Sequence, residues 1–362
     1  MMPIIAFRVD SSTTIGVGHV ARCLTLADVF RIRGAHVVFI CRDLPGNSIL
    51  QIRHNNFEVK VLPYSSAVTP VIVDSKDYVS WLGVSLEEEI TDSIAVLSSF
   101  KIKLLVVDHY GLDLVWENKL SKFTEKLLVI DDLANRGHTC DFLVDQTLGQ
   151  KSSLYEYLVP KKCVVLAGSK YALLRPEFRE QRLASIARRK MPVLKCILVS
   201  MGGIDRLNST CAVLDGLNNS NLSSMIKVNV VMGSNAPHLC DVVSYAQDSR
   251  FDVAVSTNVS NMGELLCESD LAIGAGGSSS WERCCLGVPS IVIATADNQL
   301  DIIQKLAETG SAKTISSTVT LALKLTDMIN NLVMPDDLVD LSLRSSSATD
   351  GFGAELVINE VL

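Results

Sequence analysis

Short apolar runs alternate with amphipathic segments along most of the chain. The run Ile4-Ile5-Ala6-Phe7 predicts a strand, and apolar residues spaced three and four apart from Val20 to Phe30 predict a helix that ends at Arg33-Gly34. Further strands are predicted at residues 37–41, 58–62, 104–108 and 126–131, and helices at 85–100 and 114–125. This alternation is typical of a parallel sheet with crossover helices.

A second alternation begins near residue 164. It predicts strands at 164–167, 196–200, 227–232, 253–256, 271–274 and 290–294, with helices at about 209–218, 237–247, 261–268, 279–286 and 298–309. Pro176 fits the first position of a solvated helix after a linker. We therefore expect an α/β protein of two doubly wound, Rossmann-like domains that face each other across a cleft.

The expected boundaries follow from these two alternations. The first domain is predicted to span residues 1–155 and the second residues 156–340. Residues 341–362 form a C-terminal segment that can pack back on the first domain. Residues 65–90 and 315–345 receive no role from the sequence.

Composition narrows the classes of function. The 362 residues are 48% hydrophobic, enough to fill two cores, and the net charge of −7 argues against a sequence-independent grip on nucleic acid. No apolar run reaches the length of a membrane span, and the N-terminus lacks a signal-peptide pattern, so we expect a cytoplasmic protein with no membrane partner. Ten cysteines without a Cys-x-x-Cys pair favour small buried thiols. The sequence offers no cluster of metal ligands, and we expect neither a metal nor a cofactor.

The turn after the first strand carries an ionisable side chain. Asp10, Gly16, Gly18 and His19 follow that strand directly, and a helix begins there. Ligands of open α/β sheets bind outside the carboxyl ends of the strands, so these four residues are candidates for contact with a substrate. The positive end of the helix favours a neutral imidazole, which can accept a proton as a general base. Alternatively, His19 only caps the helix or packs in the loop.

A glycine turn in the second half predicts an anion site. Gly276, Gly277, Ser278 and Ser279 follow the strand predicted at residues 271–274 and open a helix. Backbone amides and hydroxyls at such a helix start can bind a diphosphate without a metal.

Two further features flank this site in the sequence. Glu282 lies one turn into the same helix, where its carboxylate can bind a ribose diol or, with Ser279, form a capping box. The second glycine turn, Gly202-Gly203, follows the strand predicted at 196–200 and can approach a phosphate or sugar closely.

Other polar residues lie at predicted strand ends in the first half. Tyr110 can bind the sugar or a water, or can pack over its loop. Asp10, Asp108, Asp131 and Asp132 could each orient His19 or cap a helix. His109 and His138 are interpreted as loop histidines.

Short motifs follow one another in order along nearly the whole chain. They are Arg8-Val9-Asp10-Ser11-Ser12, Ile15-Gly16-Val17-Gly18-His19, Arg22-Cys23-Leu24-Thr25-Leu26-Ala27, Asp108-His109-Tyr110, Ile130-Asp131-Asp132-Leu133-Ala134, Tyr171-Ala172-Leu173-Leu174-Arg175-Pro176-Glu177-Phe178, Gly276-Gly277-Ser278, Trp281-Glu282 and Asn298-Gln299. In these motifs the chain resembles the pseudaminic acid pathway hydrolases that remove the nucleotide from UDP-2,4-diacetamido-2,4,6-trideoxy-β-L-altropyranose. That family is in turn similar to the glycosyltransferases with two facing Rossmann-like domains (GT-B-like).

The resemblance implies an activity and a set of roles. It implies hydrolysis of a UDP-linked 2,4-diacetamido-2,4,6-trideoxyhexose at the anomeric carbon with inversion, without a metal, with His19 as general base and Tyr110 beside it. The implied UDP-sugar contacts are the backbone near Asn261-Met262 for uracil, Glu282 for ribose, Ser278 and Ser279 for the diphosphate, and Asn298 and Gln299 for the sugar. Arg206 and Met201 depart from the family pattern, which has Pro and Phe there.

Two other classes of function stay open at this point. A glycosyltransferase would use His19 to activate an acceptor hydroxyl in place of water. A non-catalytic sensor would bind the nucleotide sugar and close on it without turnover. The oligomeric state is not predicted.

Overall fold

The chain folds into two compact units. The structure is a computed structural model that describes residues 2–64, 78–332 and 334–362, so part of the 65–90 segment lies outside the described residues. Unit 1 comprises Met1–Leu173 and Phe352–Leu362, and unit 2 comprises Leu174–Gly351.

Unit 1 is built on a parallel sheet of seven strands in the order β3-β2-β1-β4-β5-β6-β7. Its strands are β1 (Ile4–Val9), β2 (His36–Arg42), β3 (Glu58–Leu62), β4 (Ile102–Asp108), β5 (Thr124–Ile130), β6 (Phe142–Asp145) and β7 (Val164–Ala167). The five strands expected in the first half are confirmed, whereas the four-residue strand β6 is too short to show a pattern. Strand β7 was expected to open the second alternation, but it pairs with β6 from Phe142–Val164 to Asp145–Ala167.

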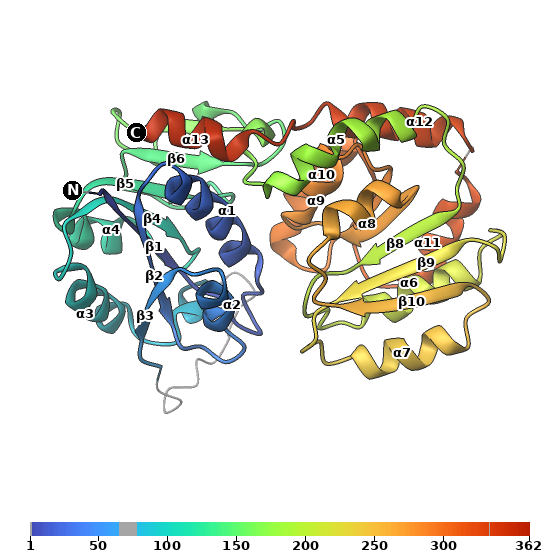
Figure 1. The fold of residues 1–362 in the computed structure, drawn as a ribbon, viewed down its shortest axis with the longest axis horizontal. Coiled ribbons are helices and arrows are strands. Elements are labelled where there is room, and N and C mark those ends of the chain that lie inside the picture. Colours follow the sequence, from blue (N-terminus) through green and yellow to red (C-terminus); the bar gives the residue numbers. More distant parts are fainter. Residues whose placement is uncertain (1, 65–77, 333) are drawn as a thin grey trace. The chain divides into compact units, whose positions relative to one another are not determined.

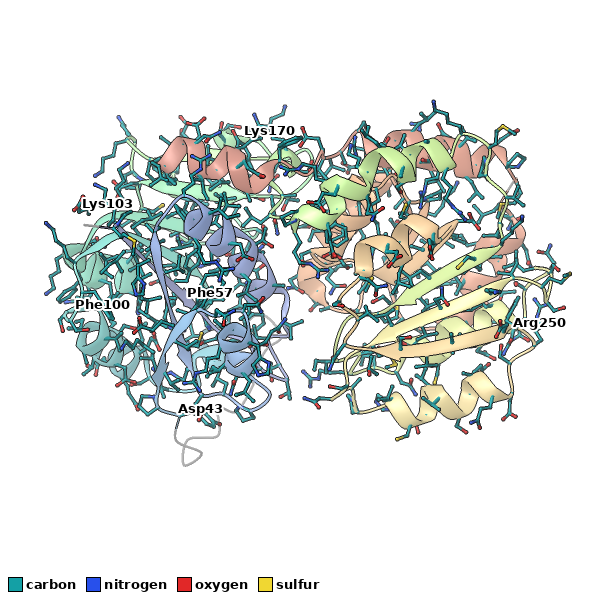
Figure 2. All side chains as sticks on the ribbon, viewed as in Figure 1. Asp43, Phe57, Phe100, Lys103, Lys170 and Arg250 are labelled. Carbon is teal, nitrogen blue, oxygen red and sulfur yellow. The ribbon has the colours of Figure 1, made fainter. Side chains whose placement is uncertain are left out.

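Helices cover both faces of this sheet. Figure 1 shows α1 and α2 on one side of strands β1 to β3 and α3 and α4 on the other. The helices are α1 (Gly18–Ile32), α2 (Ile49–His54), α3 (Leu86–Leu97), α4 (Leu114–Leu120) and α13 (Gly353–Val361), with 3-10 helices η1 (Tyr78–Leu82), η2 (Ser121–Phe123), η3 (Ser152–Tyr155) and η4 (Ser169–Tyr171). Phe7, Phe30, Phe39 and Phe57 fill the core under α1, where Phe7 and Phe39 stack with ring centroids 5.0 Å apart. Of these four, Phe57 is labelled in Figure 2.

Unit 2 is built on a parallel sheet of six strands in the order β10-β9-β8-β11-β12-β13. Its strands are β8 (Cys196–Ser200), β9 (Lys227–Met232), β10 (Asp252–Thr257), β11 (Leu271–Ala275), β12 (Ser290–Ile293) and β13 (Lys313–Ile315). Its helices are α5 (Pro176–Arg188), α6 (Ser209–Asn218), α7 (Leu239–Gln247), α8 (Met262–Glu268), α9 (Ser279–Cys285), α10 (Leu300–Glu308), α11 (Leu321–Asn330) and α12 (Asp336–Ser346), with the 3-10 helix η5 (Asp297–Gln299). Helices α7 and α8 lie on opposite sides of strands β8 to β10 (Figure 1).

The fold class of two parallel-sheet, Rossmann-like domains is confirmed by these two sheets. The structure divides the chain at Leu173–Leu174, later than the boundary expected after residue 155, because β7 completes the first sheet. The chain also returns to unit 1 at its end, where α13 packs against α1. Ala354, Val357, Ile358 and Val361 of α13 join the core under α1.

A buried ion-pair network joins helix α4 to the loop that follows β5. His138 is 3% exposed, and its Nδ1 lies 2.6 Å from Oε1 of Glu117. Burial opposes a charge on this imidazole, but the carboxylates of Asp131 and Glu117 outweigh it and raise the pKa of His138 to about 9.

This shift predicts a loss of stability on the alkaline side. The folded state holds the proton of His138 more tightly than the unfolded chain, so the stabilisation is complete below 6.5, the ordinary pKa of histidine, and is lost as the pH rises through about 9. We expect the free energy of unfolding to fall between these values and His138→Gln to flatten that slope. Urea unfolding at a series of pH values checks this, and an identical slope in the variant would contradict it.

The ten cysteines are free thiols, of which five are buried and only Cys240 is exposed. Among the helices of the described residues, none combines the length and the apolar character needed to cross a bilayer.

Candidate functional site

Polar side chains of unit 1 gather at the carboxyl ends of its central strands. In a parallel sheet these ends share one edge, so residues far apart in sequence meet there. His19 stands at the start of α1 after β1, Asp108 ends β4, and Asp132 follows β5. Gly16 has φ of +80° in the turn before α1, a conformation that suits glycine and explains that residue.

His19 and Asp108 form a hydrogen-bonded dyad. Nδ1 of His19 lies 2.7 Å from Oδ1 of Asp108, whose side chain is fully buried. Burial would raise the pKa of Asp108, but Arg22 and His19 lower it well below its usual range, so the carboxylate is ionised. At that distance from an anionic oxygen, Nδ1 donates the hydrogen bond, so Nε2 is the ring nitrogen left to exchange a proton with another partner. Of the four carboxylates considered for orienting His19, the structure therefore selects Asp108.

Arg22 links this dyad to a second carboxylate. Its Nε lies 2.6 Å from Oδ2 of Asp108 and its Nη2 lies 2.7 Å from Oδ1, a bidentate pair, while Nη1 binds Asp132. Burial would lower the pKa of Arg22, but Asp108 and Asp132 raise it well above its ordinary value. The guanidinium thus fixes both carboxylates in place.

Tyr110 is held by that second carboxylate. Its hydroxyl donates a 3.0 Å hydrogen bond to Oδ2 of Asp132. Because the phenol proton is used there, the oxygen presents only lone pairs to a further partner. The ring lies edge to face with His19, with centroids 4.7 Å apart, so Tyr110 does not simply pack over its loop.

Two more aromatic rings complete the surroundings of His19. Trp81 lies 6.2 Å from His19 and 5.7 Å from Tyr110 between ring centroids. Tyr78 lies 4.9 Å from Trp81 and 5.3 Å from Tyr110. Nothing in the sequence singled out Trp81 or Tyr78, because they sit in η1 after a segment without a clear pattern.

Asp10, expected to contact substrate, is held by other protein groups. Its side chain is fully buried, its Oδ2 accepts from Nη2 of Arg8 at 2.8 Å, and its Oδ1 accepts from the backbone N–H of Arg42 at 2.7 Å. In the structure Asp10 ties the end of β1 to Arg42 of β2, and its contact with substrate stays a prediction.

The two loop histidines are both buried. His109 is 3% exposed, its Nδ1 accepts from the N–H of Gly111, and its Nε2 lies 3.5 Å from Asp10. Burial lowers the pKa of His109 to about 4, so the ring is neutral. His138 forms the pair with Glu117, and both histidines therefore have structural surroundings that the sequence did not reveal.

Unit 2 has a pocket of its own between strands β8 and β11 and helices α8 and α9. It encloses about 260 Å³ of empty space, part of it open to solvent, and unites three predicted site residues, Met262, Ser279 and Glu282. Its remaining lining residues are Leu198, Ser200, Leu266, Ala272, Ile273 and Arg283. The space in it that a water-sized group can occupy is only about 20 Å³, so this pocket can hold a small part of a ligand and not a whole nucleotide.

The glycine turn after β11 borders this pocket. Arg283 is 4% exposed, and its Nη1 donates to Oγ of Ser279 at 3.2 Å while its Nη2 donates to the carbonyl of Ala275 at 2.9 Å. Since Ser279 Oγ accepts from a guanidinium, its own proton is available to a ligand. Ser278 is the N-cap residue of α9 and makes no side-chain capping bond.

Gly276 and Gly277 differ in what surrounds them. A Cβ on Gly276 would meet Ile303 Cγ2 at 2.6 Å, so packing alone explains this glycine. A Cβ on Gly277 would meet nothing within 4 Å, and its φ is not in the left-handed region. Neither packing nor backbone conformation therefore requires glycine at position 277.

Glu282 does not act as a capping residue. Helix α9 lacks a side-chain capping bond at its start, which contradicts the capping-box alternative. The carboxylate is 22% exposed, with Nη2 of Arg175 at 3.9 Å. Burial raises the pKa of Glu282, which Arg175 and Arg283 offset in part.

Asn298 and Gln299, which the resemblance assigns to the sugar, lie in η5. Gln299 Oε1 accepts from the N–H of Gly276 at 3.2 Å and from the N–H of Thr295 at 2.9 Å, so this oxygen braces the glycine turn. Asn298 lies beside it in η5 and is partly exposed. Contact of either residue with a sugar stays a prediction.

The second glycine turn, Gly202-Gly203, is more restricted than expected. Gly202 has φ of +95° and is exposed. At the start of α6, however, the carboxylate of Asp205 already accepts from the N–H groups of Ser209 and Thr210, at 2.9 and 2.8 Å. A phosphate at this turn would have to bind the glycine backbone instead of the helix end.

Arg22 and Arg283 are site residues that the sequence analysis did not assign. Each lies one helical turn from a predicted residue, since Arg22 comes three residues after His19 and Arg283 four after Ser279. Because residues at these spacings share a helix face, the spacing is the signal in the sequence that could have identified both arginines. The described residues contain no group of three or more His, Cys, Asp or Glu side chains that could hold a metal.

Comparisons with known proteins bear on unit 2 first. Residues 197–351 match the glycosyltransferase family 28 C-terminal domain. The match covers most of unit 2, including the pocket and both glycine turns.

A curated relative covers both units. The chain is 28% identical over 308 residues, 84% of this chain and 97% of the relative, to UDP-2,4-diacetamido-2,4,6-trideoxy-beta-L-altropyranose hydrolase of Campylobacter jejuni. The resemblance expected from the motifs is thereby confirmed.

Solved structures show the same fold at low identity. MurG of Acinetobacter baumannii is 13% identical with a TM-score of 0.67, over 100% of this chain and 99% of that one. UGT89C1 of Arabidopsis thaliana, in complex with UDP, is 12% identical with a TM-score of 0.67 over 100% of both chains.

Proposed function

We propose that this protein hydrolyses a UDP-linked 2,4-diacetamido-2,4,6-trideoxyhexose at its anomeric carbon and releases UDP and the free sugar for pseudaminic acid biosynthesis. The observation that carries the proposal is the 2.7 Å hydrogen bond between His19 and Asp108, which orients the imidazole and leaves its Nε2 as the nitrogen that can accept a proton. The named activity of the Campylobacter jejuni relative supports the same reaction.

Unit 1 supplies the groups that handle water in this proposal. A water has two protons to place while its lone pair attacks carbon. Nε2 of His19 accepts one proton, and the oxygen of Tyr110, whose own proton binds Asp132, accepts a hydrogen bond from the other. The new bond forms between the water oxygen and the anomeric carbon, and the configuration inverts in a single displacement.

Unit 2 supplies the groups that hold the leaving nucleotide. The electron pair of the broken carbon–oxygen bond goes to the diphosphate, so donors near its oxygens stabilise the transition state. Ser279, with its proton free of Arg283, and the amides of the glycine turn are suited to this. Met262 and Glu282 in the adjoining pocket suit the uracil and ribose.

Hydrolysis is tested by following the proposed substrate with proton NMR in the absence of any acceptor. We expect UDP and free sugar to appear together, with the inverted anomer first. The match of residues 197–351 to a glycosyltransferase family favours sugar transfer as a second candidate. Release of UDP only after an acceptor is added would establish that alternative instead.

The diphosphate site predicts an effect at a residue that folding does not require. Because a Cβ on Gly277 would meet open space, Gly277→Ala should leave the melting temperature unchanged. The methyl group would occupy space that a bound diphosphate needs, and we expect the Kd for UDP to rise at least about tenfold, or about 1.4 kcal/mol. Isothermal titration with UDP measures this, and wild-type affinity in the variant would remove the diphosphate from this turn.

A further inference from the structure

We propose that Trp81, together with Tyr78 and Tyr110, forms an apolar wall beside His19 that selects sugars with methyl groups where common hexoses carry hydroxyls. This inference rests on the proposed function and names the feature of the sugar that unit 1 recognises. We call these three residues the aromatic wall.

Two rings of the aromatic wall pack directly against the imidazole of His19. Tyr110 and Trp81 both turn toward His19 nearly at right angles, with interplanar angles of 84° and 78°. Trp81 and Tyr110 are inclined to each other by 33° with their ring centroids 5.7 Å apart, so the two rings pack against each other and Tyr110 supports the indole. Tyr78 meets the edge of Trp81 at 85° and holds it in place.

The indole of Trp81 is not fully buried in the protein core. Trp116 and Trp281 are 0% and 1% exposed, as is usual for a tryptophan that fills a core, whereas Trp81 is partly exposed. Its neighbour Leu82, 0% exposed, is the residue of η1 that packs into the core beneath the sheet. A large ring left partly exposed next to an ionisable dyad is suited to contact with a ligand.

The chemistry of the sugar fits such a surface. A 2,4-diacetamido-2,4,6-trideoxyhexose carries a methyl group at C6 and one on each acetamido substituent, and lacks the hydroxyls of an ordinary hexose at these positions. Methyl groups gain from burial against an aromatic face, whereas a hydroxyl placed there would lose its hydrogen bonds to water. The wall thus favours the 6-deoxy sugar over its 6-hydroxy counterpart.

The test compares two substrates, the UDP-linked 2,4-diacetamido-2,4,6-trideoxyhexose and its analogue with a hydroxyl on C6. For the wild type we expect kcat/KM to favour the 6-deoxy substrate by about 10- to 200-fold, the range for a methyl-sized group in an apolar pocket. Trp81→Ala should reduce this ratio to near one, and Trp81→Phe should keep most of it.

Controls separate recognition from general damage. Tyr157→Ala removes an aromatic ring from unit 1 that is 93% exposed and should change neither substrate's kcat/KM. The Kd for UDP should be equal in all variants because unit 2 is unaltered, and melting temperatures show whether Trp81→Ala is folded. If it is not, Trp81→Phe, Trp81→Leu and the wild type form the series.

The possible outcomes distinguish this inference from the proposed function. If Trp81→Ala keeps the wild-type ratio of kcat/KM between the two substrates, or lowers kcat/KM equally for both, the aromatic wall does not select the sugar. Hydrolysis as the proposed function would stand in either case. If the wild type releases no UDP at all, the proposed function fails, and equilibrium affinities for the two nucleotide sugars then test the wall alone. Equal affinities of wild type and Trp81→Ala for both compounds would overturn it in that case too.

Discussion

Replacing His19 by alanine is expected to lower kcat about 10²- to 10⁴-fold, the usual contribution of a positioned general base, while the Kd for UDP stays at its wild-type value. The imidazole is the only group in the proposed mechanism that takes a proton from water, and it belongs to unit 1. The nucleotide groups belong to unit 2 and keep their hydrogen bonds in the variant.

A second histidine of unit 1 provides the matched control. His36 pairs with Glu58 on an exposed part of the sheet, with Nε2 and Oε2 3.0 Å apart, so His36→Ala should turn over at the wild-type rate. Steady-state UDP release measures kcat, and titration with UDP measures binding. A rate for His19→Ala within a factor of two or three of wild type would remove this residue from the mechanism.

Asp108→Asn is expected to affect both rate and stability. The amide can donate to Nδ1 of His19 and so stabilise the tautomer that carries its proton on Nε2, where it cannot act as a base. In serine proteases the corresponding change lowers kcat about 10⁴-fold, and we expect a loss approaching that size. The substitution also takes a carboxylate from Arg22, and breaking a buried pair costs about 3 to 5 kcal/mol.

The two effects can be separated with another carboxylate of unit 1. Asp92 binds Nη1 of Arg42 at 2.9 Å, and Arg42 is not a partner of either His19 or Asp108. Asp92→Asn should lose some stability and keep its rate, whereas Asp108→Asn should lose both. Urea unfolding gives the stability and UDP release gives kcat at a temperature where each variant is folded. Full activity of a folded Asp108→Asn would show that the carboxylate does not set the tautomer.

Periodicity predicted the central elements of the fold because they obey simple spacing rules. The strand of residues 104–108 and the helix that begins beside His19 appear in the structure as β4 and α1. The short strand β6, of four residues, carries too little pattern to be recognised. Strand β7 was assigned to the second alternation because its partner, β6, was missing from the prediction.

The candidate site was predicted less completely because hydrogen-bond partners depend on tertiary contacts. The sequence placed His19, Tyr110 and four carboxylates at strand ends, but only the sheet order puts β4 beside β1 and thus Asp108 beside His19. The same sheet order buries Asp10 against Arg8 and Arg42. Trp81 follows a segment with no clear period, so no pattern could bring it next to the dyad.

The most direct test of the account is the fate of the oxygen atom that water supplies. The reaction is run in water labelled with oxygen-18, and both products are examined by mass spectrometry. Attack on the anomeric carbon, activated by His19, predicts one labelled oxygen in the free sugar and none in UDP. Label in the phosphate of UDP, with an unlabelled sugar, would show that water attacks phosphorus and would contradict the role given to the His19–Asp108 dyad.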